Sequence, residues 1–106
     1  MDVDEECTRL LAEAAANASR RAAKTLSKDA SLSVEIVAIS GGTEIKDHQT
    51  HGSSLLHTLR GSVTVSLKDS EIELPAGQLV TLASHLDHHL SAKVDNVVLH
   101  VVASGH

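Results

Sequence analysis

Residues 61–77 read GSVTVSLKDSEIELPAG, and the rest of the chain is organised around this stretch. From 62 to 67, apolar side chains alternate with small hydroxyl side chains, a pattern typical of a strand with one buried face. Polar residues at 68–70 form a turn signal, and the alternation resumes at 71–75 before a proline and a glycine end it. The stretch is therefore predicted to be a β-hairpin.

Short strand signals continue on both sides of this hairpin. A Gly-Gly pair at 41–42 marks a tight turn, and polar loops separate the other apolar runs. The predicted strands outside the hairpin cover 31–38, 43–48, 54–60, 78–83, 88–93 and 96–103. Because no helical pattern interrupts this series, the sequence predicts an all-β fold, an antiparallel sandwich or barrel.

The amino-terminal part has a different pattern. Residues 4–16 are predicted to form a short helix, since apolar residues recur at helical spacing and acids crowd the first turn. Such a helix is marginal alone, so we expect it to lie across the body or against a partner subunit. Residues 17–26 could extend the helix or begin a strand, and Asn17 favours the break. We expect an amino-terminal helix with a lead-in segment over 1–30 and a β-barrel over 31–106.

Composition limits the partners that the chain can take. At 106 residues it forms one domain, and its core has to be aliphatic because Phe, Tyr and Trp are absent. The net charge of -5, with no basic cluster, argues against a nucleic-acid or anionic-membrane partner. A single cysteine allows no internal disulfide, and the acidic amino terminus does not look like a signal peptide. We therefore expect a cytoplasmic protein.

Histidines lie on both sides of the hairpin, and here the sequence resembles a known family. Over 42–103 it resembles a cupin, the small jelly-roll barrel whose two sequence motifs flank a hairpin. In the second motif, counted from Gly77, His88 falls on the metal-ligand histidine of the family. Ala83 and His85 stand where the family usually has proline and glycine. The resemblance implies a jelly-roll β-barrel with a short amino-terminal helix.

The first cupin motif is eroded. Counting back from Gly61 places His48 on the first histidine of the usual pair. Thr50 occupies the second histidine position and Ser54 the glutamate position, so two of the four usual ligands are present. This departure weakens the expectation of metal-dependent chemistry more than the expectation of the fold.

A third ligand would have to come from elsewhere in the chain. A zinc or iron site needs three or four ligands, and adjacent strand residues point to opposite faces, so His88 and His89 cannot both enter one barrel. His51 lies in a loop, and His57 falls on the outer face by counting from Ser54. The candidate metal residues are thus His48, His88, His51 and His57. We interpret three other histidines as structural: His85, His89 and His100.

Three hypotheses of function follow. The first is a barrel that binds a small molecule, a divalent transition metal (Zn, Fe, Ni or Mn), or both, in a cavity lined by His48 and His88. The second is a metal-dependent oxygenase or isomerase with a three- or four-histidine site, as the resemblance would imply. The third is an interaction module, and we expect a homodimer because cupins commonly pair through their sheets.

Overall fold

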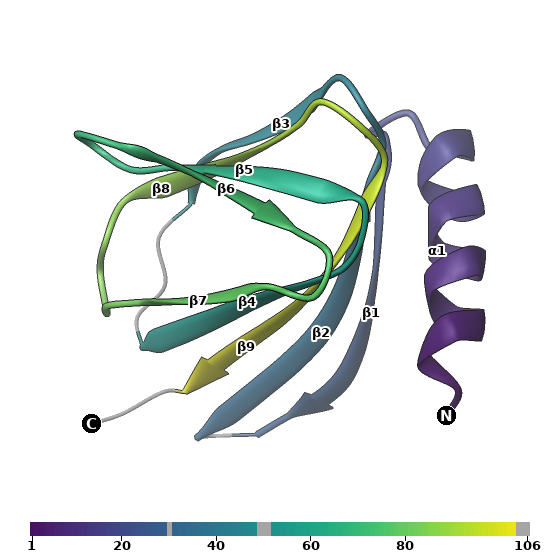
Figure 1. Ribbon diagram of the computed structural model, residues 1–106. Coiled ribbons are helices and arrows are strands. Elements are labelled where there is room, and N and C mark those ends of the chain that lie inside the picture. The colour runs from purple at the N-terminus through teal and green to yellow at the C-terminus, as the bar shows by residue number, and fades with distance from the viewer. Residues whose placement is uncertain (30, 49–51, 104–106) are drawn as a thin grey trace.

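The computed structural model describes residues 1–29, 31–48 and 52–103. These residues form one helix followed by nine strands (Figure 1). The elements are α1 (Val3–Ala16), β1 (Arg21–Lys28), β2 (Leu32–Ile39), β3 (Thr43–His48), β4 (Ser53–Arg60), β5 (Ser62–Ser66), β6 (Glu71–Pro75), β7 (Leu79–Leu82), β8 (His88–Ala92) and β9 (Asn96–Ala103). Each strand predicted from alternation is present, with bounds that differ by two residues at most.

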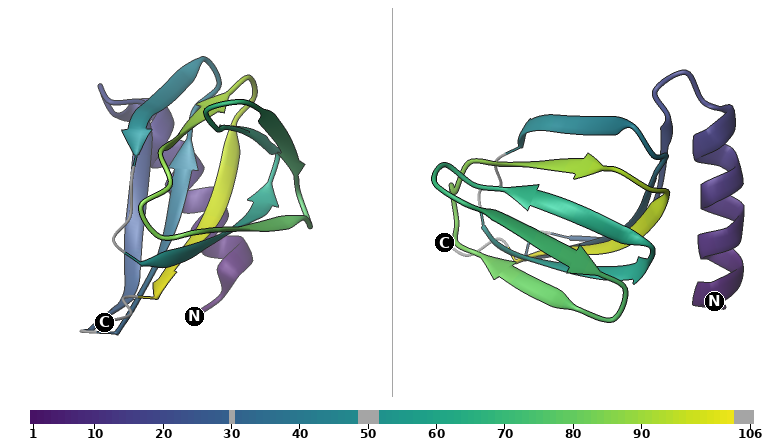
Figure 2. Two further views of the ribbon diagram at one scale, coloured as in Figure 1. Left: turned by 90° about the vertical axis from the view of Figure 1, so that its left-hand side faces the viewer. Right: turned by 45° about the horizontal axis from the view of Figure 1, so that its top comes forward.

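The strands form two antiparallel sheets that face each other. One has five strands in the order β1-β2-β9-β4-β7, and the other has four in the order β3-β8-β5-β6. Figures 1 and 2 show the sheets as two layers, with α1 outside the five-stranded sheet. The predicted antiparallel jelly roll with an amino-terminal helix is confirmed.

The helix α1 packs on its own sheet. Its amino-terminal cap is Asp2, whose Oδ1 accepts a hydrogen bond from the backbone nitrogen of Glu5 at 3.2 Å. Its buried stripe consists of Cys7, Leu10 and Ala14, and this stripe covers the outer face of β1, β2 and β9. The helix therefore lies across the body of the protein, which is one of the two roles expected from the sequence.

The segment after the helix is a strand. The helix ends at Asn17, whose backbone is extended, and β1 begins four residues later and pairs with β2. The break favoured at Asn17 is therefore confirmed. The segment before residue 31 thus supplies β1, the edge strand of the five-stranded sheet.

The hairpin has the predicted form. Strands β5 and β6 pair with Val63 opposite Leu74 and Val65 opposite Ile72. The backbone nitrogen of Leu67 donates to the carbonyl oxygen of Ser70 at 2.8 Å and closes the turn. The hairpin thus brings its apolar residues to one face of the four-stranded sheet.

The main core lies between the sheets and is aliphatic. Its buried members are Ile39, Leu56, Val63, Val65, Leu74, Leu82, Leu90, Ala92 and Val98. They come from both layers, so burying them holds the sandwich closed. No helix in the described ranges 1–29, 31–48 and 52–103 is long and apolar enough to cross a membrane.

Candidate functional site

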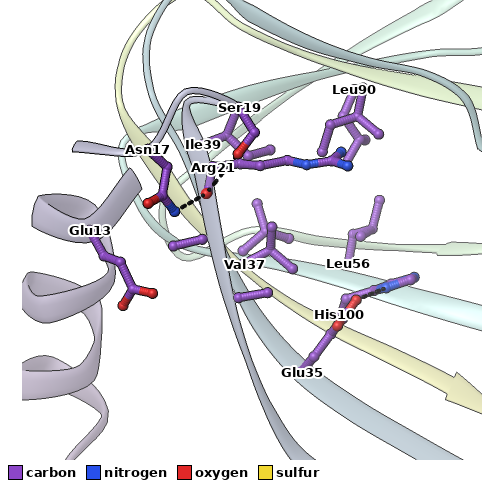
Figure 3. Close-up of a pocket in the computed structure, with 14 residues that line it drawn as sticks. Glu13, Asn17, Ser19, Arg21, Glu35, Val37, Ile39, Leu56, Leu90 and His100 are labelled. Atoms are coloured by element: carbon purple, nitrogen blue, oxygen red, sulfur yellow. Dashed lines mark hydrogen bonds and ion pairs between the residues drawn. The ribbon is translucent and has the colours of Figure 1, made fainter. Parts of the chain in front are cut away.

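A pocket of about 640 Å³ opens between the two sheets. Figure 3 shows it beside the edge strand β1, with the end of α1 on one side and the strands of the sandwich on the other. Its deep wall is aliphatic and combines both sheets: Val37, Ile39, Leu56 and Val98 from one, Ile45 and Leu90 from the other. Ligand sites in proteins have this size and combine an apolar wall with polar side chains.

Six polar residues belong to the described lining. Glu35, His100 and Arg21 lie on β2, β9 and β1, while Glu13, Asn17 and Ser19 lie near the end of α1. Polar groups placed against an aliphatic wall are what fix the orientation of a ligand in such sites.

Glu35 and His100 form a pair inside the pocket. They are Cα partners in the ladder of β2 and β9, so their side chains share one face of the sheet. The Nδ1 atom of His100 lies 3.4 Å from Oε1 of Glu35, close enough for a weak hydrogen bond in which Nδ1 donates to the carboxylate (Figure 3). The His100 side chain is buried, whereas that of Glu35 is 37% exposed and reaches the opening.

The alternation of β2 explains why Glu35 faces the pocket. Ile36 and Ala38 face α1, so Glu35, Val37 and Ile39 point the other way, toward the second sheet. β2 therefore contributes apolar side chains to two layers, and Glu35 is its one charged residue.

Arg21 contributes a positive charge at the opposite end of the opening. Its carbonyl oxygen accepts hydrogen bonds from Nδ2 of Asn17 at 2.9 Å and from Oγ of Ser19 at 3.3 Å, which holds the start of β1 against the turn. Figure 3 shows its side chain extended across the pocket toward Leu90. Among the described residues, none accepts a hydrogen bond from its guanidinium group or pairs with it.

The two ends of the opening are well separated. Arg21 is opposite Ile39 in the β1–β2 ladder, and Glu35 is opposite Thr25. Their backbone positions therefore differ by four residues, about 13 Å along the strands at the usual rise. The pocket has a cationic end and a Glu35–His100 end.

His88 lies on the inner face of the four-stranded sheet. It is two residues from Leu90, which belongs to the core, and only 3% of it is exposed, whereas the adjacent His89 is exposed. Its Nδ1 lies 3.0 Å from the carbonyl oxygen of Leu86. Because a carbonyl oxygen only accepts, Nδ1 carries the proton and Nε2 is the nitrogen suited to coordination.

The fold brings together the two histidine segments that flank the hairpin. In the ladder of β3 and β8, His48 and His88 are Cα partners. The side chain of His48 and the whole of His51 lie outside the described residues. His88 is not part of the described pocket lining.

His57 lies apart from His88, on the other sheet. In the five-stranded sheet it pairs with Leu99 on one side and Leu79 on the other, and Leu99 packs against the cluster beneath α1. Directly opposite residues share a face, so His57 belongs to the outer face, as counting from Ser54 predicts. The described structure therefore places His57 and His88 on different sheets, with His57 on an outer face and His88 on an inner one.

The described donor atoms do not fit a transition-metal centre. Among the side chains that the structure describes, which do not include those of residues 30, 46–51 and 104–106, no group of three or more His, Cys, Asp or Glu could hold a metal ion. Ser54, at the position of the family's glutamate, is buried, and its Oγ has no hydrogen-bond partner in the described structure. A neutral hydroxyl is a poor replacement for a carboxylate ligand.

Comparisons with solved structures identify the fold. A cupin superfamily protein from Desulfitobacterium hafniense matches with a TM-score of 0.77 and 15% identity, over 80% of this chain and 78% of that one. An RmlC-like cupin from Shewanella frigidimarina matches with a TM-score of 0.74 and 16% identity, over 81% and 78%. A conserved protein of unknown function from Streptococcus pyogenes matches with a TM-score of 0.78 and 20% identity, over 85% and 79%.

These similarities show that the chain has the small, RmlC-like cupin fold. No family model matches the sequence, and no curated protein matches it. At such low identity the neighbours establish architecture alone, so the pocket has to be interpreted from its own residues.

Sequence reasoning missed the polar residues of the pocket. His100 was interpreted as structural, and Glu35 and Arg21 were not singled out. A signal was available in their position, because Glu35 and His100 are each the only ionisable residue of their strand. Arg21 carried no comparable signal.

Proposed function

We propose that this protein binds a small, mostly aliphatic molecule in the pocket between its sheets. The observation that carries the proposal is the combination of a 640 Å³ volume with an aliphatic wall and six polar side chains. Glu35, His100 and Arg21 provide polar contacts there. His48 and His88, expected from the sequence to line the cavity, are outside the described lining and belong to the second candidate function below.

The chemistry of the wall selects the ligand. Without Phe, Tyr or Trp, the pocket offers no surface for stacking a base or a sugar. Each methylene group of a ligand that leaves water contributes about 0.8 kcal/mol. Burial of a hydrocarbon chain against this wall would therefore supply much of the binding free energy.

The test blocks the opening of the pocket without overfilling the core. Ala23 lines the pocket on β1 and is exposed, so Ala23→Phe places a ring in the opening. Ser27→Phe adds the same ring to the same strand at an exposed position outside the described lining. The probe is 1-hexanol, followed through the methyl NMR signals of Leu56 and Leu90.

We expect saturable shifts of these methyl signals in the wild-type protein and in Ser27→Phe, and at least fivefold weaker binding in Ala23→Phe. Far-UV circular dichroism should show that both variants fold. If the wild-type signals do not saturate, or if both variants bind equally, pocket binding is ruled out.

A second candidate function is binding of a divalent metal at His48 and His88. It is favoured by their direct pairing in the β3–β8 ladder and by the Nδ1 hydrogen bond that leaves Nε2 of His88 in the coordinating tautomer. We propose Zn, Fe, Ni or Mn as the metal. An oxygenase or isomerase would need at least one further ligand from outside the described donor set.

Elemental analysis of protein purified without added metal tests this second candidate. Stoichiometric metal that is lost in His48→Ala and in His88→Ala, and kept in His89→Ala, supports it. His89 is the matched control because it is adjacent on the same strand and exposed. Protein without metal in several preparations, or an equal loss in all three variants, excludes it.

We also propose that the protein forms a homodimer through the outer face of the five-stranded sheet. Helix α1 packs mainly on β1, β2 and β9, and it leaves an uncharged area next to it. Its residues are Leu32, Val34, Leu55, His57, Leu79, Thr81 and Val101. Leu79 is 55% exposed and Leu32 is 39% exposed.

A second copy suits this area because it contains no acidic or basic side chain other than one histidine. Two chains of net charge -5 can meet there without opposing like charges. In sedimentation experiments we expect Leu79→Asp to be monomeric and Val94→Asp, which changes an exposed residue in the β8–β9 turn, to remain dimeric. A monomeric wild-type protein, or two dimeric variants, would refute this interface.

A further inference from the structure

We propose that the ligand of the pocket is an aliphatic carboxylate whose acid group binds Arg21. This inference rests on the proposed binding function and specifies the class of ligand. It comes from the charges that line the pocket and from their partners in the described structure.

The charge of Glu13 is balanced within the helix. Its Oε2 lies 3.0 Å from NH1 of Arg9, one helical turn away. The carboxylate of Glu35 is likewise close to the imidazole of His100. Both acidic side chains of the described lining therefore have a nearby basic group.

Arg21 differs from these residues. Among the described residues it is the lining charge that has neither an ion-pair nor a hydrogen-bond partner for its side chain. Its guanidinium group extends across the pocket toward Leu90 (Figure 3). A carboxylate matches a guanidinium group in charge and in shape, because it accepts two parallel hydrogen bonds.

The other end of the opening fixes the orientation of such a ligand. That end lies about 13 Å away along the strands, where the Glu35 carboxylate is beside His100 and the described lining offers an acid group no guanidinium or ammonium group. The acid group is thus placed at Arg21, and the hydrocarbon chain extends inward along Leu56 and Val98. A primary amine has the opposite preference and would be repelled by Arg21.

The test compares three probes with hydrocarbon chains of equal length: hexanoate, 1-hexanol and hexylamine. By isothermal titration at low salt, we expect hexanoate to bind the wild-type protein at least tenfold more tightly than 1-hexanol, and hexylamine to bind most weakly. The preference for hexanoate should fall as salt is raised, since Arg21 is exposed at the opening and its charge is screened.

Variants identify the residue that causes the preference. Arg21→Ala should weaken the binding of hexanoate at least tenfold and change the affinity for 1-hexanol less than twofold. Arg21→Lys keeps the positive charge and should lose only part of the affinity for hexanoate. Lys28→Ala removes a charge at the far end of the same strand and should leave the affinities for both probes unchanged.

The outcomes separate this inference from the proposed function. Equal affinity of hexanoate and 1-hexanol, or hexanoate binding that survives Arg21→Ala, overturns the role of Arg21 and leaves pocket binding intact. If none of the three probes binds, both the role of Arg21 and the proposed binding of a ligand in the pocket are overturned.

Discussion

Glu35 and His100 meet across neighbouring strands, with His100 Nδ1 3.4 Å from Glu35 Oε1, although 65 positions separate them in the sequence. Because His100 is buried and the Glu35 side chain is 37% exposed, the pair joins the interior of the sandwich to its opening. It therefore orders the part of the pocket that is farthest from Arg21.

A double-mutant cycle measures how strongly this pair is coupled. We expect Glu35→Ala and His100→Ala to show a coupling of about 0.5–1 kcal/mol in urea denaturation, since the distance is long and one partner is partly exposed. His100→Ala combined with Leu79→Ala should be additive, because Leu79 lies on the outer face of the sheet. If His100 and Leu79 showed an equally large coupling free energy, the coupling between Glu35 and His100 could not be assigned to their direct contact.

The helix α1 should contribute to stability through Leu10. Leu10 is fully buried against the outer face of the five-stranded sheet. We expect Leu10→Ala to lower the free energy of unfolding by about 2–4 kcal/mol, from lost burial and the cavity that remains. Leu11→Ala removes the same atoms from a partly buried position and should cost less than half as much. Equal losses would contradict the packing described for α1.

Strand positions could be predicted from the sequence because each strand buries at least one face. The hairpin and the strands around it alternate with a period of two, and glycines mark their turns. The exception is β1, where Ala22 alone is buried and the remaining positions are exposed or half-buried. Its strand structure depends on pairing with β2, and no local pattern records that pairing.

The motif positions also carried structural information. Counting from Gly61 and Gly77 selected His48 and His88, which prove to be Cα partners. His85, at the position where cupins usually have glycine, has a positive φ of 63°. A positive φ is a backbone conformation that favours glycine, and a histidine adopts it here.

The pocket could not be predicted in the same way. Its charged residues lie on β1, β2 and β9, which are brought together by pairing between distant segments. Which face of β2 turns inward depends on where α1 packs, because both faces of that strand carry apolar residues. A period of two shows that faces alternate, and it does not show which face borders a cavity.

Glu73 should make stability depend on pH in the acidic range. Ser62 Oγ and Thr64 Oγ1 donate hydrogen bonds to its carboxylate at 2.8 and 2.9 Å, and these bonds lower the pKa of Glu73 below its ordinary value of 4.5. The folded state thus favours the ionised form. Its contribution is fully present above pH 4.5 and is lost as the pH falls through the lowered pKa.

The corresponding experiment compares urea midpoints from pH 7 to pH 3. Glu73→Gln should be less stable than wild type at pH 7, and the difference should shrink as the pH falls. Thr64→Val, which keeps the shape and removes one donor, should show part of the same change. A difference between Glu73→Gln and wild type that stays constant with pH would contradict the assigned role of the two hydroxyl groups.

Gly61 should be far more sensitive to substitution than Gly42, although both have a positive φ, of 66° and 89°. A Cβ at Gly61 would overlap the carbonyl oxygen of Asp95, a backbone atom that cannot move aside without shifting the start of β9. At Gly42 nothing lies within 4 Å of the added atom, so alanine there adds only conformational strain of about 1–2 kcal/mol. We expect Gly61→Ala to lower the free energy of unfolding by at least about 3 kcal/mol, since steric overlap adds to the same strain. Urea denaturation of the two variants measures both losses of unfolding free energy, and their difference gives the cost of the steric overlap at Gly61. Equal losses would show that backbone strain alone accounts for the effect of alanine at both positions.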